Sequence, residues 1–358
     1  MKNIKFYVIL FVIYISKKGK FGYSTIDPTT SVMKFFSKNT KAIFLILIII
    51  TLVVGLWYKN RCGKEYTRTE FLLNTQCTIT AYGKDAKIAV DAAFDEIGRI
   101  HSLTDFYDEA SEISKINSAK AGEVISVDKA ITDILSVALD VCEASNGAFD
   151  ITVAPLSALW NFGGTEQTPP DDGLIKQAKA AVGYKNILID AQKCTVTKAK
   201  DETKIDLGGA AKGYSADCAI SVMENYDITG AIADLGGNVS CFGKNPKNRN
   251  KDWRIGIQVP YAPSGEYGEI ITLAKGSVVT SGTYQRNFEY NGTLYHHILS
   301  PFTGYPVNHT YDSVTITADS SLLADCLSTA CFVLGEKEGR ALAEKYNAQI
   351  SIINRYRG

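Results

Sequence analysis

One uncharged segment constrains this chain more than any other feature. Residues 42–58 read AIFLILIIITLVVGLWY, which is 17 residues with a single hydroxyl group, that of Thr51. This length is short for a membrane-spanning helix and long for the apolar core of a signal peptide. Lysines precede the segment, and Trp57 and Tyr58 end it, where aromatic rings favour a membrane interface. The pattern predicts a membrane anchor, and a buried core helix is the alternative.

The charges divide the chain at the end of this segment. Residues 1–58 carry eight lysines and one acidic residue, whereas the other 300 residues carry 30 basic and 37 acidic side chains. The whole chain has no net charge, which argues against nucleic-acid binding. Met33 opens a second charged start, MKFFSK, just before the apolar run. We therefore expect the natural start at Met33, with the segment before it a mis-assigned extension.

These observations predict the domain organisation. Residues 1–41 are expected to be a cytoplasmic or mis-assigned extension, 42–58 an anchor, 59–70 a linker and 71–358 one domain. The anchor would hold the chain in the inner (cytoplasmic) membrane, with the domain on the extracytoplasmic side. The eight cysteines include no C-x-x-C pair, so they are expected to be core residues and not zinc ligands.

The expected domain mixes helices with hairpin-like strands, which is typical of the α+β class with largely antiparallel sheets and flanking helices. The apolar fraction of 46% is that of a globular chain. Periodicity predicts helices over 85–103, 212–226, 320–334 and 336–346, and another that Asp128 caps and Asn146 ends. Predicted strands cover 76–82, 186–190, 194–198, 231–235, 253–259, 269–273, 286–290, 313–317 and 349–354.

Two segments share the tetrapeptide Asp-Leu-Gly-Gly. Residues 206–214 read DLGGAAKGY, in which a strand end, two glycines and a helix start follow one another. Backbone N–H groups at such a turn can bind a phosphate, and an ordinary strand-to-helix turn is the alternative. Residues 233–238 read ADLGGN, with the tetrapeptide repeated 28 residues later. Two such turns around one helix favour a shared ligand, and a tight hairpin is the alternative.

Histidine, carboxylate and hydroxyl groups supply two further candidates. TSGTY at 280–284 is followed by HHILSPFTG at 296–304. Adjacent residues of a strand point to opposite sides, so one histidine could be a base and the other structural. Asp325 and Thr329 share a face of an otherwise apolar helix, and their oxygens suit Mg²⁺ or Ca²⁺ better than zinc. A solvated helix face is the alternative for this pair.

In this order the segments resemble the ApbE-type FAD:protein FMN transferases. The resemblance covers about residues 70–355 and also includes LNT at 73–75, residues 107–114 and GAFDITV at 147–153. It implies a single α+β, T-fold-like domain that uses Mg²⁺ and splits FAD at its pyrophosphate. FMN would pass to a Ser or Thr hydroxyl of a target flavoprotein, and AMP would leave. The acceptor would be a subunit of a membrane redox complex of the Rnf or Nqr kind, or another exported flavoprotein.

The same resemblance assigns roles to individual residues. The metal ligands would be Asp325, Thr329 and the carbonyl group of Gly209, and His297 is the histidine needed for transfer. Imidazole is a base near neutral pH, which suits the removal of a hydroxyl proton. Contacts with FAD would come from Leu73, Tyr107, Ala148, Phe149, Asp150, Asp206 and Lys212.

The chain departs from the family pattern at three places. Leu73-Asn74 stands where Met-Gly is common, and Thr283 and Ser300 stand where acidic or amide residues are common. None of these changes removes a matched metal ligand or His297, so activity is expected. Two alternatives stay open: an Mg²⁺-dependent pyrophosphatase that yields FMN and AMP, and a membrane-anchored FAD-binding protein without catalysis.

Overall fold

The structure, a computed structural model, describes residues 45–55, 64–165, 167–263 and 265–354. The chain divides into one unit up to Tyr58 and a second from Lys59. Residues 45–55 of the first unit form a helix with exposed side chains. Within the described ranges, no helix has both the length and the hydropathy for a membrane crossing. Met33 and both ends of the expected anchor at 42–58 lie outside the described residues, so the anchor stays a prediction.

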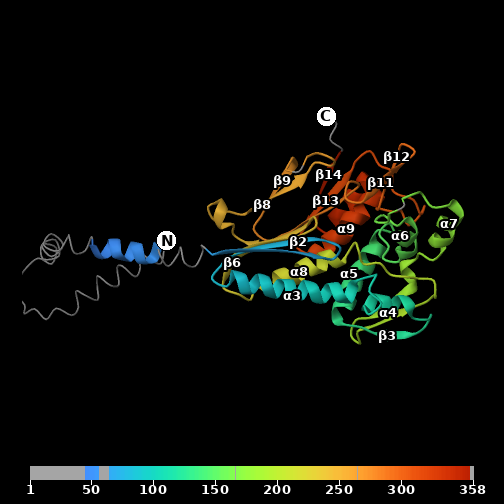
Figure 1. Ribbon diagram of the computed structural model, residues 1–358, viewed down its shortest axis with the longest axis horizontal. Helices are drawn as coiled ribbons and strands as arrows, with labels where there is room; N and C mark the ends of the chain where they lie inside the picture. The colour runs from blue at the N-terminus through green and yellow to red at the C-terminus, as the bar shows by residue number, and fades with distance from the viewer. Residues whose placement is uncertain (1–44, 56–63, 166, 264, 355–358) are drawn as a thin grey trace, which may run out of the picture. The chain divides into compact units, whose positions relative to one another are not determined.

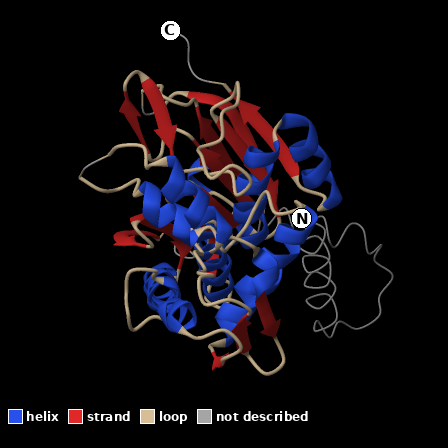
Figure 2. Ribbon diagram, turned by 90° about the vertical axis from the view of Figure 1, so that its right-hand side faces the viewer, coloured by secondary structure: helices blue, strands red, loops and turns tan. Residues whose placement is uncertain are grey.

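A seven-stranded sheet forms the centre of the second unit (Figures 1 and 2). From edge to edge, its strands are β1 (Glu65–Leu72), β2 (Thr75–Gly83), β6 (Ile228–Leu235), β7 (Asn238–Gly243), β10 (Gly276–Gly282), β13 (Ser313–Ala318) and β14 (Gln349–Ile353). Every neighbouring pair is antiparallel, as the predicted α+β class requires. Two-residue turns join β1 to β2 and β6 to β7, and both residues of each turn have positive φ, as type I′ turns need.

Helices cover one face of this sheet. They are α3 (Ala86–Thr104), α8 (Ala211–Met223), α9 (Ser321–Leu334) and α10 (Glu336–Lys345). Cys77, Ile79 and Ala81 alternate along β2, are fully buried and pack with α3 and α8. Because such a site leaves no room for relaxation, truncating Ile79 to alanine would cost about 2–5 kcal/mol of unfolding free energy.

The opposite face of the sheet is only partly covered. The hairpin of β8 (Trp253–Gln258) and β9 (Tyr267–Leu273) lies over it, and Trp253, Ile255 and Ile257 pack with Cys241 and Val278. Beyond this hairpin, hydroxyl groups pair across β1 and β2, Thr67 with Thr80 at 2.8 Å and Thr69 with Thr78 at 3.0 Å. The two faces of one sheet therefore differ in composition and in exposure.

The remaining elements surround α9 and the ends of the sheet. They are α4 (Glu112–Ser118), α5 (Lys129–Ala144), α6 (Ala154–Trp160), α7 (Asp172–Ala180), the small sheet of β3 (Val124–Ser126), β5 (Thr195–Lys198) and β4 (Ile187–Asp190), the hairpin of β11 (Asn287–Tyr290) and β12 (Thr293–His296), and the short 3-10 helices η1 (Tyr184–Asn186) and η2 (Pro246–Asn248). Asp128 caps α5 as expected, because its carboxylate accepts the Ala130 N–H at 2.8 Å.

Most predicted elements are confirmed. The strand expected to end at Leu207 is wrong, because residues 199–210 between β5 and α8 form loops and turns. The central strands β7 and β10 were not predicted, and a further error lies at the start of the domain. The expected linker at 59–70 is wrong from Glu65 onward, where strand β1 begins. This edge strand carries charges at Glu65, Arg68 and Glu70, and they obscure the strand pattern. Of the seven described cysteines, all are free and five are buried, as expected of core residues. Cys62 lies outside the described residues.

Candidate functional site

Each of the helices α8 and α9 supplies a carboxylate that accepts backbone N–H groups from the first turn of the other helix. The Asp325 carboxylate accepts the Gly213 N–H of α8 at 2.9 Å. In return, the Asp217 carboxylate accepts the N–H groups of Ser321 at 2.7 Å and Leu322 at 3.0 Å. A Cβ atom on Gly213 would lie 2.4 Å from the Ser321 carbonyl oxygen, so glycine permits this close approach. Negative charge at a helix N-terminus is stabilising, and these reciprocal hydrogen bonds fix Asp325 relative to α8.

The three predicted metal ligands lie together at this crossing. Asp325 is buried, with 3% of its surface exposed, and Thr329 follows one turn later on α9. A Cβ atom on Gly209 would lie 3.6 Å from Thr329 Oγ1, which brings the loop before α8 against α9. Lys212 lies 3.5 Å from Asp325 Oδ1 and donates to the Gly208 carbonyl at 2.8 Å. The site therefore combines one carboxylate, one hydroxyl, loop carbonyls and one ammonium group.

The oxygen atoms available here fit Mg²⁺. In a regular helix the Gly213 N–H would bond back to the carbonyl of Gly209, but it donates to Asp325 instead. In the described part of the chain, no amide donates to the Gly209 carbonyl. Among the described residues, no three or more His, Cys, Asp and Glu side chains are grouped so that they could hold a metal ion. Few protein ligands, with water and phosphate oxygens completing the shell, are typical of Mg²⁺.

The loop that contains Ala148, Phe149 and Asp150 lies beside the loop that precedes α8. A Cβ atom on Gly209 would lie 3.1 Å from the Phe149 ring. The Asp206 N–H donates to the Ile151 carbonyl at 2.8 Å, which joins the two loops. Ala148 and Phe149 are both buried. Four of the residues expected to contact FAD therefore lie in two adjacent loops, together with Gly209.

Asp150 is occupied by protein groups. One carboxylate oxygen accepts from the N–H and the hydroxyl of Thr152 at 2.8 and 2.6 Å, and the other accepts the Tyr184 N–H at 3.0 Å. Burial raises the pKa of Asp150, although these hydrogen bonds act in the opposite direction. In this structure Asp150 fixes the shape of the loop, and its expected contact with FAD stays a prediction.

Tyr107 and Leu73, which were also expected to contact FAD, belong to neither of these two loops. Tyr107, in the connection between α3 and α4, is 81% exposed and touches Phe106 edge-on, with ring centroids 5.3 Å apart. No hydrogen bond or ring contact within the described residues joins it to Phe149. Leu73 and Asn74 form the β1–β2 turn with φ of 53° and 56°. Residues other than glycine and asparagine seldom adopt this backbone conformation.

The two adjacent histidines have different surroundings. His296 is buried at the end of β12, and its Nε2 lies 2.7 Å from the Val307 carbonyl, to which it donates. His297 is half-buried, and its N–H donates to the Arg286 carbonyl at 3.1 Å. Its Nδ1 lies 3.3 Å from the same carbonyl oxygen. Because an acceptor faces Nδ1, the proton belongs there, and the lone pair of Nε2 is left for another proton.

The charge state of His297 agrees with that geometry. Burial, followed by the charge of Arg286, lowers the pKa of His297 to about 3. Lys212 contributes in the same direction, so the candidate metal site and His297 affect each other electrostatically. The imidazole is consequently neutral at pH 7, so its Nε2 can accept a proton, but the low pKa makes it a weaker base than an ordinary histidine.

Three supporting residues were not assigned from the sequence. Asp217 caps α9 from another helix, and Arg286 donates to the Asn74 carbonyl at 3.4 Å, linking the β1–β2 turn to His297. Ser281 lies 2.7 Å from Ser328 Oγ and 3.3 Å from Thr329 Oγ1, so it orients the hydroxyl face of α9. The Thr-Ser-Gly motif pointed to Ser281, whereas no local pattern distinguished Asp217.

The chain is similar to known proteins both in sequence and in fold. The sequence profile of the ApbE family matches residues 73–353. The FAD:protein FMN transferase of Treponema pallidum is 30% identical over 329 residues, which are 86% of this chain and 90% of the relative. The crystal structure of the ApbE protein from Thermotoga maritima is similar with a TM-score of 0.73 and 34% identity, over 81% of this chain and 94% of that one. The flavin transferase ApbE from Vibrio cholerae gives a TM-score of 0.72 with 26% identity, over 81% and 93%.

Proposed function

We propose that this chain, which belongs to the ApbE family, is an FAD:protein FMN transferase. The observation that carries the proposal is the gathering of Asp325, Thr329 and Gly209 at one helix crossing, with Lys212 beside them. Such a set suits a diphosphate and a divalent cation. A carrier that only binds FAD would not need a neutral histidine near this set, so we favour catalysis.

The transfer forms one phosphorus–oxygen bond and breaks another. The oxygen of a Ser or Thr hydroxyl on the acceptor attacks the phosphorus atom of the FMN half of FAD. A new phosphorus–oxygen ester bond forms, and the bond from that phosphorus to the bridging oxygen breaks. AMP leaves with the electron pair, and the hydroxyl proton passes to Nε2 of His297, which is neutral at pH 7.

Residues of the chain supply the electrostatics of this step. Asp325, Thr329 and the carbonyl of Gly209 would hold Mg²⁺, which neutralises charge on phosphate oxygens when it is bound. The ammonium of Lys212 lies beside Asp325 and can pair with a phosphate oxygen. We also propose that Phe149, Ala148 and Asp206 line the flavin-dinucleotide site, with Leu73, Tyr107 and Asp150 in contact with its ends.

The location and the acceptor complete the proposal. We infer that residues 42–58 anchor the chain in the cytoplasmic membrane and that the domain is extracytoplasmic, because the run is uncharged and the body after it is acidic. The acceptor would then be an exported flavoprotein or a membrane redox subunit of the Rnf or Nqr kind. Protease added to spheroplasts should digest the domain, and complete protection until lysis would contradict this orientation.

One incubation tests the activity. The full chain in detergent is mixed with FAD, Mg²⁺ and an exported Rnf-type flavoprotein subunit, and a parallel sample contains EDTA. Covalently flavinylated acceptor, formed only with Mg²⁺, supports transfer. Free FMN without labelled protein would indicate a pyrophosphatase, and bound but intact FAD would indicate a carrier.

A further inference from the structure

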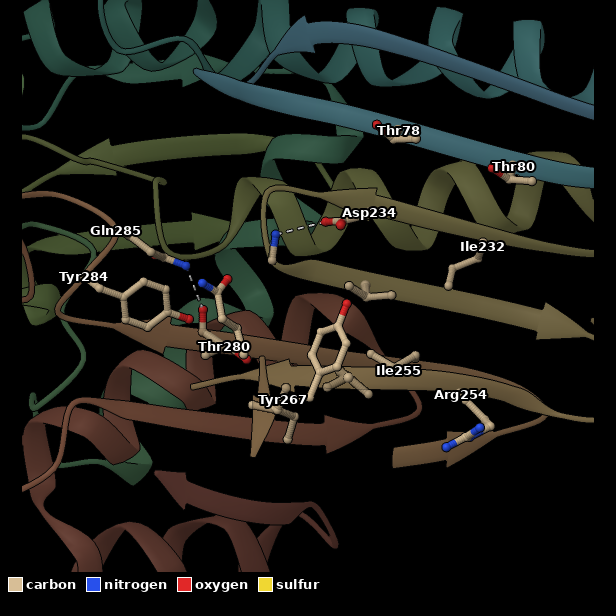
Figure 3. Close-up of a pocket in the computed structure, with 16 residues that line it drawn as sticks. Thr78, Thr80, Ile232, Asp234, Arg254, Ile255, Tyr267, Thr280, Tyr284 and Gln285 are labelled. Atoms are coloured by element: carbon tan, nitrogen blue, oxygen red, sulfur yellow. Dashed lines mark hydrogen bonds between the residues drawn. The ribbon is translucent and has the colours of Figure 1, made fainter. Parts of the chain in front are cut away.

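A cavity lies on the face of the central sheet that is opposite α8 and α9. Its volume is about 540 Å³, and it is a partly open cleft between the sheet and the β8–β9 hairpin (Figure 3). Thr78 and Thr80 of β2 and Asp234 of β6 line the sheet side, and Ile255 and Tyr267 line the hairpin side. Because side chains alternate along a strand, the sheet separates this cavity from the candidate metal site.

One end of the cavity reaches the segment that holds His297. Gln285 lines this end, and a Cβ atom on Gly237 would lie 3.4 Å from its Nε2. The next residue, Arg286, carries the carbonyl that accepts the His297 N–H at 3.1 Å. Arg286 also binds the Asn74 carbonyl of the β1–β2 turn. A ligand that reaches Gln285 would therefore lie next in the chain to the residue whose carbonyl group binds His297.

The lining suits a polypeptide better than a nucleotide. Threonine hydroxyls, the Gln258 and Gln285 amides and the rings of Tyr267 and Tyr284 offer donors, acceptors and flat apolar surfaces. Tyrosine and amide groups of this kind are typical of protein-binding surfaces. The carboxylate of Asp234 is part of the lining and would repel a phosphate.

Two large exposed side chains border the cavity. Tyr267 is 58% exposed, and Phe71 of β1 is 74% exposed. The hydroxyl pairs between β1 and β2 put Thr69, and therefore Phe71, on the same face of the sheet as Thr78. Exposed aromatic groups beside a cavity are a feature of interaction sites. At the far end lies Arg254, for which the described residues provide no ion pair.

We propose that this cavity, with Phe71 at its border, binds an extended segment of the acceptor protein and guides its Ser or Thr hydroxyl to His297. The polar lining would pair with the backbone of the segment, and Arg254 would receive an acidic side chain or carbonyl at its distal end. The inference rests on the proposed transferase function and adds to it the place where the macromolecular substrate docks.

The test separates docking from chemistry. Tyr267→Ala and Arg254→Glu are measured with an exported Rnf-type subunit as acceptor, and Ile88→Ala, an exposed position on α3, is the matched control. Both cavity variants should raise the KM for the acceptor about tenfold, the effect of losing one well-placed interface side chain. FAD affinity should match wild type, as should all values for Ile88→Ala.

A crosslinking experiment covers variants that fold poorly. The photoreactive residue p-benzoylphenylalanine at position 267 should attach to the acceptor peptide that contains the flavinylated residue. Unchanged acceptor KM in both variants, or attachment only to other parts of the acceptor, would overturn the docking site while leaving transfer intact. Loss of FAD affinity in both variants would also overturn it, because the cavity would then serve the nucleotide. Absence of transfer by the wild-type chain would overturn the proposed function itself.

Discussion

The two faces of the central sheet are built from neighbouring residues of the same strands, yet they serve opposite needs. On β10, the Ser281 hydroxyl points toward α9 and lies 2.7 Å from Ser328, whereas Thr280 lines the cavity on the other face. On β6, Leu235 is fully buried, and Asp234 beside it lines the cavity. The closed face holds groups in fixed positions, and the open face leaves space for a large substrate to enter and leave.

This difference has a physical basis. Side chains on the helical face pack against α3, α8 and α9, so a displacement of any of them would open a cavity. On the opposite face beyond the β8–β9 hairpin, the hydroxyl pairs between β1 and β2 can exchange their hydrogen bonds for bonds to water at little cost. A site for a small charged substrate gains from the first environment, and a site for an exchangeable protein segment gains from the second.

The largest effect is expected at Asp325, on the closed face. Asp325→Ala should abolish transfer while leaving the fold intact, because the carboxylate serves the proposed metal site and the buried apolar contacts of α9 remain. Loss of its hydrogen bond to the Gly213 N–H should lower the free energy of unfolding by about 1–3 kcal/mol. Transfer is measured by flavin fluorescence of the acceptor band, and Mg²⁺ binding by thermal shift. Asp319→Ala, an exposed carboxylate just before α9, is the control. Full transfer by a folded Asp325→Ala protein would remove Asp325 from the site.

His297 comes next. His297→Asn should lower single-turnover transfer about 10²–10⁴-fold, the usual contribution of general-base catalysis, with FAD and Mg²⁺ affinities unchanged. His296→Ala should affect transfer much less and should act on stability, since its ring packs on Phe332 and bonds to Val307. A defect in His297→Asn that disappears at saturating FAD would contradict the role of base.

The pH profile checks the same residue without a mutation. A pKa of about 3 keeps His297 neutral from pH 7 down to pH 5, so transfer should show no loss centred near pH 6.5. The effect of His297 on folding stability as the pH falls is the opposite of the effect of a histidine paired with a carboxylate. The unfolded chain binds more protons at this residue below its ordinary pKa, so His297 disfavours the folded state as the pH falls below about 6.5. A midpoint of transfer near pH 6.5 would show that His297 titrates as an ordinary exposed histidine.

Asp217 should have an intermediate effect, through position alone. The Asp217 carboxylate accepts three hydrogen bonds from groups at the start of α9. Asp217→Asn removes its negative charge, so the Asp325–Thr329 face should lose its fixed orientation. We expect Mg²⁺ affinity to fall about 10–100-fold, as for other groups that support metal ligands. Ser320→Ala, which removes a local cap of the same helix, should lower stability without this loss. Equal Mg²⁺ affinities in the two variants would limit Asp217 to a structural role.

The smallest and most direct comparison uses adjacent residues of β10. Ser281→Ala should weaken Mg²⁺ binding only a few-fold, since one neutral hydrogen bond contributes about 0.5–1.5 kcal/mol. Thr280→Ala, on the other face, should leave Mg²⁺ binding unchanged and act on the acceptor KM. Identical effects of the two substitutions would mean that the sheet does not separate the two functions.

Much of the candidate site could be predicted because its parts are local. The glycine-rich loop before α8, the four-residue spacing of Asp325 and Thr329, and the pair of histidines are each visible within a few residues. The ordered set of motifs indicated the family, which the profile match confirmed. By contrast, β1 was missed because edge strands carry charges, and the expected contact of Tyr107 has no counterpart among the described contacts.

The sequence by itself determined the local elements, the α+β class and the residue types available for phosphate chemistry. Hydrophobic periodicity and helix spacing act over a few residues, so they are visible in one chain. Only the tertiary structure decided which groups meet. Asp217 caps Ser321 across 104 residues, and Arg286 joins Asn74 to the histidine segment across 212. The cavity beside β2 depends on a hairpin that is distant in sequence. Such contacts are set by how helices and strands pack, and no local pattern of residues encodes them.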